Sequence, residues 1–318
     1  MAALFVASES AVPAESRFLP SVGMTNLTSN SSINEHCESR EDVEGINLLT
    51  IDHVTVCGSD LERMRRGFAS IGLQTEYGGA HANGLTHMAL VGFEDGSYVE
   101  LIAPVEGGDF SKASGMMAGW MPLMLGDGGT GAWAIRAPEI HGRVNELRAR
   151  GIEVRGPERG GRTKPDGTRL EWETAVVGAG AAGTVLPFMI EDRTERELRA
   201  RAGSNQLGVG GVAAVLIGVR ELEAAINLFH RAYGREDAAL EEHPEFGARL
   251  AWFERTPVIL AEATGSWLSK RLEKFGEGPV GFLLRGAKIH GADSNWFGKH
   301  VRWFEEKRIG AKIGLIDV

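Results

Sequence analysis

The sequence predicts an α+β protein made of tandem β-α-β-β-β units, whose mixed sheets curve into cups. Three observations predict this class. A strand–helix–strand–hairpin pattern recurs along the chain, two of its openings match closely ("IRAPEIHG" at 135 to 142 and "LRGAKIHG" at 284 to 291), and 43 glycines separate short apolar runs. One such unit leaves an open sheet edge and an uncovered face. Units must therefore pair, and two paired units enclose a concave face.

The first unit begins where the sequence becomes regular, near residue 48. Leu49 to Val56 is apolar and β-branched, which is typical of a strand, and Asp60 is placed to cap a helix from Leu61 to Ile71. Three more strands are expected near Leu73 to Tyr77, Thr86 to Phe93 and Tyr98 to Ala103. Asp95-Gly96 between the last two is a strong hairpin signal.

The same order of elements recurs three more times. A second unit opens at 131 to 154 and closes with the strands of "GTRLEWETAVV" and "TVLPFMIED". A third opens at 212 to 234 and closes with "ARLAWFE" and "PVILAEA". A fourth opens at 280 to 291, and the chain ends after its helix and one strand. Units one and two thus predict a complete cup, and units three and four an incomplete second cup.

These units divide the chain into three regions. Residues 1 to 45 are rich in Ser, Asn, Glu and Ala without periodicity and indicate a disordered leader. Residues 46 to 200 are expected to form the first two-unit domain. Residues 208 to 318 are expected to form a second, degenerate domain.

Composition excludes several classes of partner. The net charge of −9 argues against a nucleic-acid binder, which needs a basic face. No apolar run approaches the roughly 20 residues that cross a bilayer, so we expect no membrane association. With two cysteines and no basic, apolar leader, the sequence predicts a reducing, cytoplasmic setting.

The pattern resembles the vicinal oxygen chelate superfamily, and within it the glyoxalase-like domain proteins. "IDHVTV" is similar to the family's opening strand, and "HMALVGFEDGSYVELIAP" to its third and fourth strands; the resemblance is good over about 48 to 195. It implies a divalent metal, here Zn, Fe, Mn or Ni, held by side chains of the first and fourth strand of each unit. His53 and Glu100 stand at those positions of unit one.

The other units depart from the family pattern. Aligning the helices places Ala132, Ala214 and Gly281 where unit one has His53. Phe188 stands at the Glu100 position of unit two, and an apolar residue, Leu260, at that of unit three. Only unit one keeps ligand-type residues, so a site with two ligands from each unit is not available. A hydrogen-bonded His53–Glu100 pair in a metal-free cup is the alternative.

Two further histidines are candidates for a third ligand or a substrate contact. With Asp95-Gly96 as a two-residue turn, Val91 lies opposite Glu100, and His87 falls on the same face. His87 would then lie roughly 13 Å along the strand from Glu100, too far to share an ion without a bulge. His81, in "GGAHANG", lies in a loop that could fold over a ligand.

Three other features could line the cup. Arg162 precedes a turn at Asp166-Gly167 and could bind a substrate carboxylate or phosphate, or be a solvated turn charge. Trp172 faces inward and is a candidate wall. The run "GMMAGWMPLML" (115 to 125) is either an apolar lid over the pocket or a connector that packs under the sheet.

These features predict a glyoxalase-like, metal-assisted isomerase or lyase acting on a small, oxygen-rich molecule in the first cup. Its metal would chelate substrate oxygens, and Glu100 would move the proton. If His87 also bound the metal, an Fe(II)-dependent dioxygenase would become a rival. The alternatives are a metal-free binding or sequestering protein, and a homodimer in which the incomplete second half finishes a cup with another chain.

Overall fold

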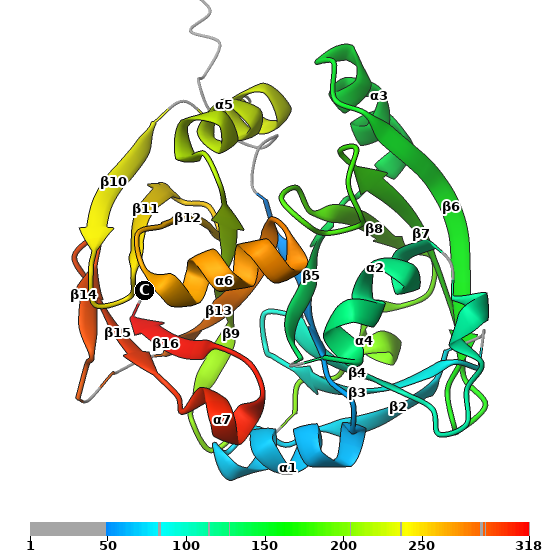
Figure 1. The fold of residues 1–318 in the computed structure, drawn as a ribbon. Coiled ribbons are helices and arrows are strands. Elements are labelled where there is room, and N and C mark those ends of the chain that lie inside the picture. Colours follow the sequence, from blue (N-terminus) through cyan, green and yellow to red (C-terminus); the bar gives the residue numbers. More distant parts are fainter. Residues whose placement is uncertain are drawn as a thin grey trace, which may run out of the picture. The chain divides into compact units, whose positions relative to one another are not determined.

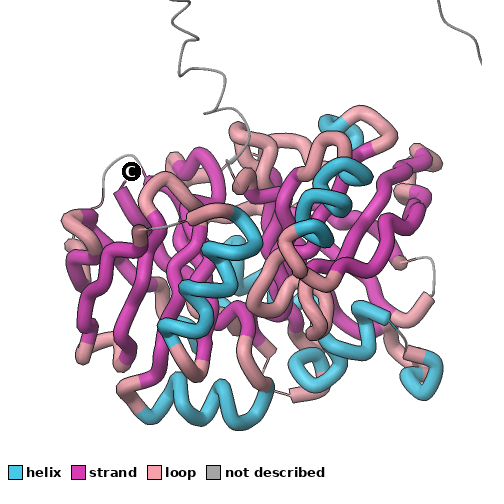
Figure 2. Tube along the Cα trace, turned by 90° about the horizontal axis from the view of Figure 1, so that it is seen from above, coloured by secondary structure: helices cyan, strands magenta, loops and turns pink. Residues whose placement is uncertain are grey.

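The computed structural model describes residues 49–81, 84–113, 115–126, 128–203, 205–235, 237–286, 289 and 291–317. They belong to one compact unit, Gly45–Val318. The predicted disordered leader, residues 1 to 45, lies outside the described residues. Most elements of the compact unit are strands, and the helices lie against them (Figures 1 and 2). No described helix has the length and apolar character that a membrane-spanning segment needs.

The first sheet contains eight strands in the order β2-β3-β4-β1-β5-β8-β7-β6. They are β1 (Ile51–Cys57), β2 (Glu76–Ala80), β3 (Thr86–Gly92), β4 (Tyr98–Pro104), β5 (Gly129–Arg136), β6 (Val154–Thr163), β7 (Arg169–Val177) and β8 (Phe188–Asp192). The first strands of the two units, β1 and β5, pair antiparallel at the centre, and each pairs in parallel with its own fourth strand. Units one and two thus pair to form one sheet, as the sequence predicts.

The second sheet repeats this order with β10-β11-β12-β9-β13-β16-β15-β14. Its strands are β9 (Val209–Val219), β10 (Ala238–His243), β11 (Ala248–Phe253), β12 (Val258–Ala263), β13 (Gly278–Gly286), β14 (Ser294–Trp296), β15 (Lys299–Trp303) and β16 (Ile313–Asp317). The α+β class with two curved, mixed sheets is therefore confirmed.

The second cup differs from the expectation that it is incomplete. Unit four supplies four strands, not two, and what it lacks is a long helix after its first strand. The described part of the β13–β14 connection (289 and 291–293) is not helical, and α7 (Glu306–Ile309) is a short helix between β15 and β16. Because the sheet already has eight strands, it needs no strand from another chain, which removes the reason given for a homodimer.

The helices divide between the two faces of the sheets. α1 (Leu61–Ser70), α3 (Ile140–Ala149) and α5 (Leu222–Tyr233) follow the first strands of units one to three, whereas α2 (Gly115–Met124) and α6 (Ser266–Phe275) connect the units. α1 shows the predicted local signals, since the Asp60 side chain accepts the Arg63 N–H at 2.9 Å and Leu61, Met64 and Phe68 are buried.

The two concave faces are filled differently. In the first cup, Met117, Trp120 and Leu123 of α2 pack with inward residues of the sheet and leave a cavity beside them. In the second cup, Trp296 is fully buried and packs edge-on against Phe246, with ring centroids 4.9 Å apart. The cavity makes the first cup the candidate site.

The β3–β4 hairpin corrects the predicted register. Phe93 and Ser97 close a loop of three residues, Glu94, Asp95 and Gly96, and Gly96 has φ +76°. Glu100 therefore pairs with Leu90 rather than Val91. A shift of one residue turns every side chain of a strand to the other face.

Candidate active site

The cavity of the first cup has a volume of about 260 Å³ and lies between α2 and the concave face of the sheet. Its apolar wall includes Met116, Met117 and Trp120 of α2, so the Met-rich run both connects the units and covers the cavity. Its polar lining consists of His53, His81, Thr86, Tyr98, Glu100, Arg162, Thr174 and Arg199.

His53 projects from β1 into this cavity and is held on three sides. Its ring stacks on Tyr98, with centroids 4.7 Å apart, and meets Phe188 edge-on at 5.4 Å. Its Nδ1 lies 2.6 Å from Asp52 Oδ1. The β1–β5 register shifts between Ile51 and His53, an irregularity that lets adjacent residues meet although strand neighbours normally face opposite sides.

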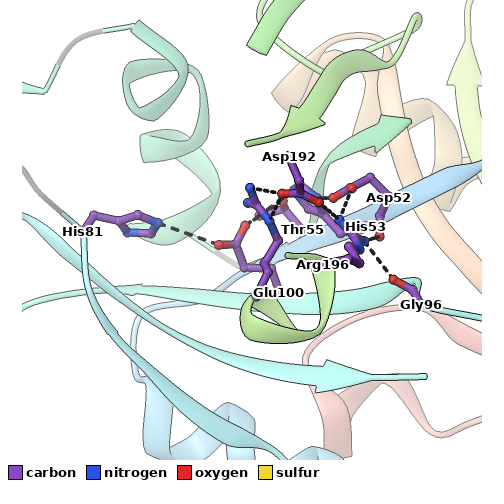
Figure 3. A network of polar contacts seen from close by, with 9 residues as sticks. Asp52, His53, Thr55, His81, Gly96, Glu100, Asp192 and Arg196 are labelled. Atoms are coloured by element: carbon purple, nitrogen blue, oxygen red, sulfur yellow. Dashed lines mark hydrogen bonds and ion pairs between the residues drawn. The ribbon is translucent and has the colours of Figure 1, made fainter. Parts of the chain in front are cut away.

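Asp52 is almost fully buried, and Arg196 of α4 (Arg196–Arg199) compensates its charge. Arg196 Nη1 pairs with the Asp52 carboxylate and lies 3.0 Å from Asp192 Oδ2, while Nη2 donates to the Gly96 carbonyl at 2.8 Å (Figure 3). Burial acts to raise the pKa of Asp52, but the hydrogen bond and charge of His53, together with Arg196, hold it below its usual range. The carboxylate is ionised, so it accepts the Nδ1–H of His53, and Nε2 of the ring faces the cavity.

Glu100 stands between two imidazoles. His53 Nε2 lies 3.7 Å from its Oε2 and His81 Nε2 lies 3.7 Å from its Oε1, on opposite sides of the carboxylate (Figure 3). Thr55 Oγ1 donates to Oε2 at 3.4 Å. Burial acts to raise the pKa of Glu100, but the polar contact with the His81 imidazole and the charges of His53, His81 and Arg162 outweigh it and lower the pKa to about 2.

Arg162 and Trp172 of unit two both line the cavity. The Arg162 guanidinium is buried and donates from Nη1 to the Gly78 carbonyl; it makes no ion pair with any described residue. The Trp172 ring lies 4.4 Å under the guanidinium carbon of Arg199, whose Nε donates to Asp192 Oδ1 at 2.6 Å. The structure thus brings His53, Glu100, Arg162 and Trp172 together.

His87 is not among the residues that line the cavity. In the observed register it pairs with Ala103 and faces the opposite side of the sheet from Glu100, where its ring meets Tyr77 edge-on at 6.1 Å. The three-residue hairpin loop is the cause, since it shifts the face by one residue. His81, the other candidate histidine, does line the cavity and lies beside Glu100.

Sequence reasoning missed Asp52, Arg196 and Arg199. Asp52 could have been found from the sequence, because a carboxylate that stands in an apolar strand next to His53 needs a partner when it is buried. The two arginines could not have been found in this way. They come from a helix of four residues that lies about 140 positions after β1 in the chain, and no periodic pattern marks it.

The residues present do not make a complete metal centre. Among the residues that the structure describes, no three histidine, cysteine or carboxylate side chains are grouped closely enough to hold one ion. Unit two has Ala132 and Phe188 where unit one has His53 and Glu100, and neither can bind a metal. The strand pairing agrees with this alignment, because Ala134 pairs with Phe188 between β5 and β8 as Thr55 pairs with Glu100 between β1 and β4.

Unit three is apolar at the same positions. If Ala214 corresponds to His53, then Leu216 corresponds to Thr55, and its partner in β12 is Ile259 rather than the predicted Leu260. Its cup therefore offers neither an imidazole nor a carboxylate at these two positions.

Comparison with known proteins agrees with the fold. A model of a family described as glyoxalase-like domain matches residues 51–233, more than half of the chain, and the chain belongs to this family. No curated protein matches the sequence.

Three solved structures are similar to the chain. A hypothetical protein from Staphylococcus aureus is 14% identical, with a TM-score of 0.59, over 85% of this chain and 99% of its own. A mutant 4-hydroxymandelate synthase from Streptomyces coelicolor is 9% identical, with a TM-score of 0.53, over 86% and 93%. A methylmalonyl-CoA epimerase from Streptomyces coelicolor is 19% identical, with a TM-score of 0.32, over 34% and 94%. The first two share the fold, and the third is too distant to support an argument.

Proposed function

We propose that the protein is an enzyme that moves a proton on a small, oxygen-rich anion bound in the first cup, as an isomerase or lyase does. The observation that supports this proposal most is the arrangement of Asp52, His53 and Glu100. The buried, ionised carboxylate of Asp52 orients the His53 imidazole, whose Nε2 faces the cavity and Glu100. A histidine held this way is suited to act as a general base through its Nε2.

His53 takes the part that the sequence suggested for Glu100. A carboxyl group with a pKa of about 2 is a poor proton acceptor near neutral pH. Glu100 instead stabilises the imidazolium that forms when His53 Nε2 accepts a proton, because its carboxylate lies 3.7 Å away. Asp52 holds the ring and stabilises the same charge from the Nδ1 side.

Arg162 is the group that binds the anionic end of the substrate. It is a buried guanidinium without an ion-pair partner in the described ranges, and it can engage a carboxylate through two parallel hydrogen bonds. The apolar wall of Met116, Met117 and Trp120 accommodates the rest of a ligand that fits about 260 Å³.

The test is proton exchange in deuterated water, followed by NMR, over a panel of 2-hydroxy and 2-oxo carboxylic acids. We expect exchange of one C–H with at least one acid. His53→Gln should slow it roughly 10²- to 10⁴-fold, and Arg162→Gln should raise KM more than it lowers kcat. His141→Gln is the control, because His141 is exposed on α3. No exchange with any acid, or exchange that survives His53→Gln, would refute the proposal.

A metal-dependent enzyme is the second candidate, supported by one observation. Both Nε2–carboxylate separations at Glu100 are 3.7 Å, too long for direct hydrogen bonds. Two imidazoles with one carboxylate are the donors of Fe(II) oxygenases, but His53, His81 and Glu100 would have to move closer together than in the structure to hold one ion. Metal analysis of protein purified without chelators tests it for Zn, Fe, Mn and Ni. Metal that is lost in both His53→Ala and Glu100→Ala would support this candidate, and a full complement in either variant would exclude it.

A metal-free binding protein is the alternative from a different class. It predicts that an acid of the panel binds, that Arg162→Gln weakens the binding, and that no proton exchanges. Calorimetry beside the exchange assay separates it from the enzyme.

A further inference from the structure

A second, larger cavity of about 740 Å³ lies between the two sheets of the compact unit. It is bounded on one side by the start of β1, the β3–β4 loop and the end of β5. On the other side lie residues of β9, β10, β11, β13 and β15 and of the β11–β12 and β14–β15 loops. It shares no lining residue with the cavity of the first cup.

The lining is rich in cations, although the chain as a whole has a net charge of −9. The lining contains Arg136, Arg255, Arg285 and Lys299 but only two carboxylates, those of Asp95 and Glu254; the charges of Asp52 and Asp192 act on Arg136 from outside the lining. The Asp95 carboxylate is already engaged, since its Oδ1 accepts the Ser97 N–H at 2.8 Å and the Ser97 hydroxyl at 2.6 Å.

None of the four cations makes an ion pair with a described residue. Arg136 is the most buried of the arginines: its Nη2 donates to the Asp95 carbonyl at 2.8 Å, and its Nε has no hydrogen-bond partner. An unpaired, half-buried guanidinium is costly unless an anion engages it.

Two aromatic rings stand beside these cations. Trp252 and Phe297 meet edge-on, with centroids 5.4 Å apart, and Trp252 Nε1 donates to the Thr256 carbonyl at 2.9 Å, which fixes its ring. Lys299 Nζ lies 6.0 Å from the centroid of the Trp252 ring. Fixed aromatic rings beside cations suit a ligand that has both a planar ring and a negative charge.

The backbone is strained at the same place. Three non-glycine residues of the described chain have a left-handed φ, and two of them line this cavity: Arg255 (φ +58°) and Phe297 (φ +52°). Such conformations cost free energy and cluster at binding sites, where the surrounding structure holds a side chain in a required position.

We propose that this cavity binds a nucleoside phosphate, with the base against Trp252 and Phe297 and the phosphate on Arg285, Lys299 and Arg136. A nucleoside phosphate has a planar ring to contact the aromatic residues and a negative charge to contact the cations. The cavity volume of about 740 Å³ lies in the range of small-molecule sites. The site is independent of the reaction proposed for the first cup.

Isothermal titration of the full-length protein with AMP tests this proposal. We expect saturable binding with one site per chain that weakens as salt is added. The double variant Arg285→Gln/Lys299→Gln should lower the affinity roughly tenfold to hundredfold. Lys270→Gln/Lys307→Gln removes the same charge from exposed positions outside the cavity and should leave the affinity unchanged. Binding should also quench tryptophan fluorescence, and Trp252→Phe should reduce the quench.

Adenosine and inorganic phosphate separate the two halves of the ligand, and each should bind at least about tenfold more weakly than AMP. Phosphate that binds as tightly as AMP would overturn the assignment of a nucleoside. Absence of saturable AMP binding would overturn the site. Binding that survives the double variant but is lost in Arg162→Gln would place the ligand in the first cup and overturn the proposal as well.

Discussion

Replacement of Arg196 by alanine should reveal how much the buried network beneath His53 contributes to stability. Arg196 donates to the Asp52 carboxylate, to the Asp52 carbonyl at 3.3 Å and to the Gly96 carbonyl at 2.8 Å. Asp52 is only 1% exposed, so water cannot replace these contacts without opening the structure. Breaking a buried pair by removing one partner costs about 3–5 kcal/mol, and we expect Arg196→Ala to lower the free energy of unfolding by that amount.

The assay is urea denaturation near neutral pH, followed by circular dichroism and by tryptophan fluorescence. Arg169→Ala is the matched control. Arg169 pairs with Glu171 at 2.8 Å, but both side chains are at least half exposed, so its loss should cost less than about 1 kcal/mol. Similar slopes in the three proteins are needed for the midpoints to report stability.

A second variant measures the same interaction if Arg196→Ala folds poorly. Asp52→Asn combined with Arg196→Ala removes both charges, and it should recover part of the lost stability because no uncompensated carboxylate remains. Arg196→Ala within about 1 kcal/mol of the wild type, or a double variant no more stable than the single one, would refute the claim that Arg196 compensates Asp52.

Three further outcomes are expected. The pKa of Glu100 in the folded protein is about 2, below its usual 4.5, so ionised Glu100 stabilises the fold by on the order of 3 kcal/mol above about pH 4.5. This stabilisation is lost as the pH falls toward 2, and the unfolding free energies of the wild type and Glu100→Gln should therefore converge on acidification. A difference that stays constant with pH would contradict this. Gly92→Ala should destabilise the protein by about 1–3 kcal/mol, because a Cβ there would lie 2.0 Å from the Arg201 carbonyl oxygen. Gly142→Ala, which has open space around it on α3, should stabilise the protein by about 0.5–1 kcal/mol. Thermal denaturation of both variants shows whether each change in stability has the expected sign. Phe188→His adds an imidazole at the position of unit two that corresponds to Glu100. Titration with Co²⁺ should show an affinity for the ion at least about tenfold higher than that of the wild type. An unchanged affinity would count against the correspondence of the two units.

Local chemistry made much of the architecture predictable. The recurrence of a strand, an amphipathic helix and a hairpin indicated units that must pair, and the structure pairs β1 with β5 and β9 with β13. The Asp60 cap and the start of α1 at Leu61 were correct, because a cap depends on residues a few positions apart.

The β3–β4 hairpin shows where local reading fails. Asp95-Gly96 correctly marked a turn, but a two-residue and a three-residue loop both place glycine at a positive φ. The choice between them depends on contacts outside the hairpin: the Asp95 N–H donates to the Gly210 carbonyl at 3.2 Å, and the Ser97 hydroxyl accepts the Val212 N–H at 3.0 Å. One residue of loop length then decided that His87 faces away from the cavity that Glu100 lines.

The sequence by itself determined the repeating units and their curved sheets, because strand alternation and helical periodicity follow from residues near in the chain. The approach of His53 to Glu100 was expected from the resemblance to the glyoxalase-like proteins. Only the tertiary structure decided what surrounds that pair. Arg196 and Arg199 reach it from a four-residue helix, and the cations of the second cavity come together from two sheets. Contacts between residues so far apart leave no periodic trace in the sequence, and they form only when the packed sheets close the distance.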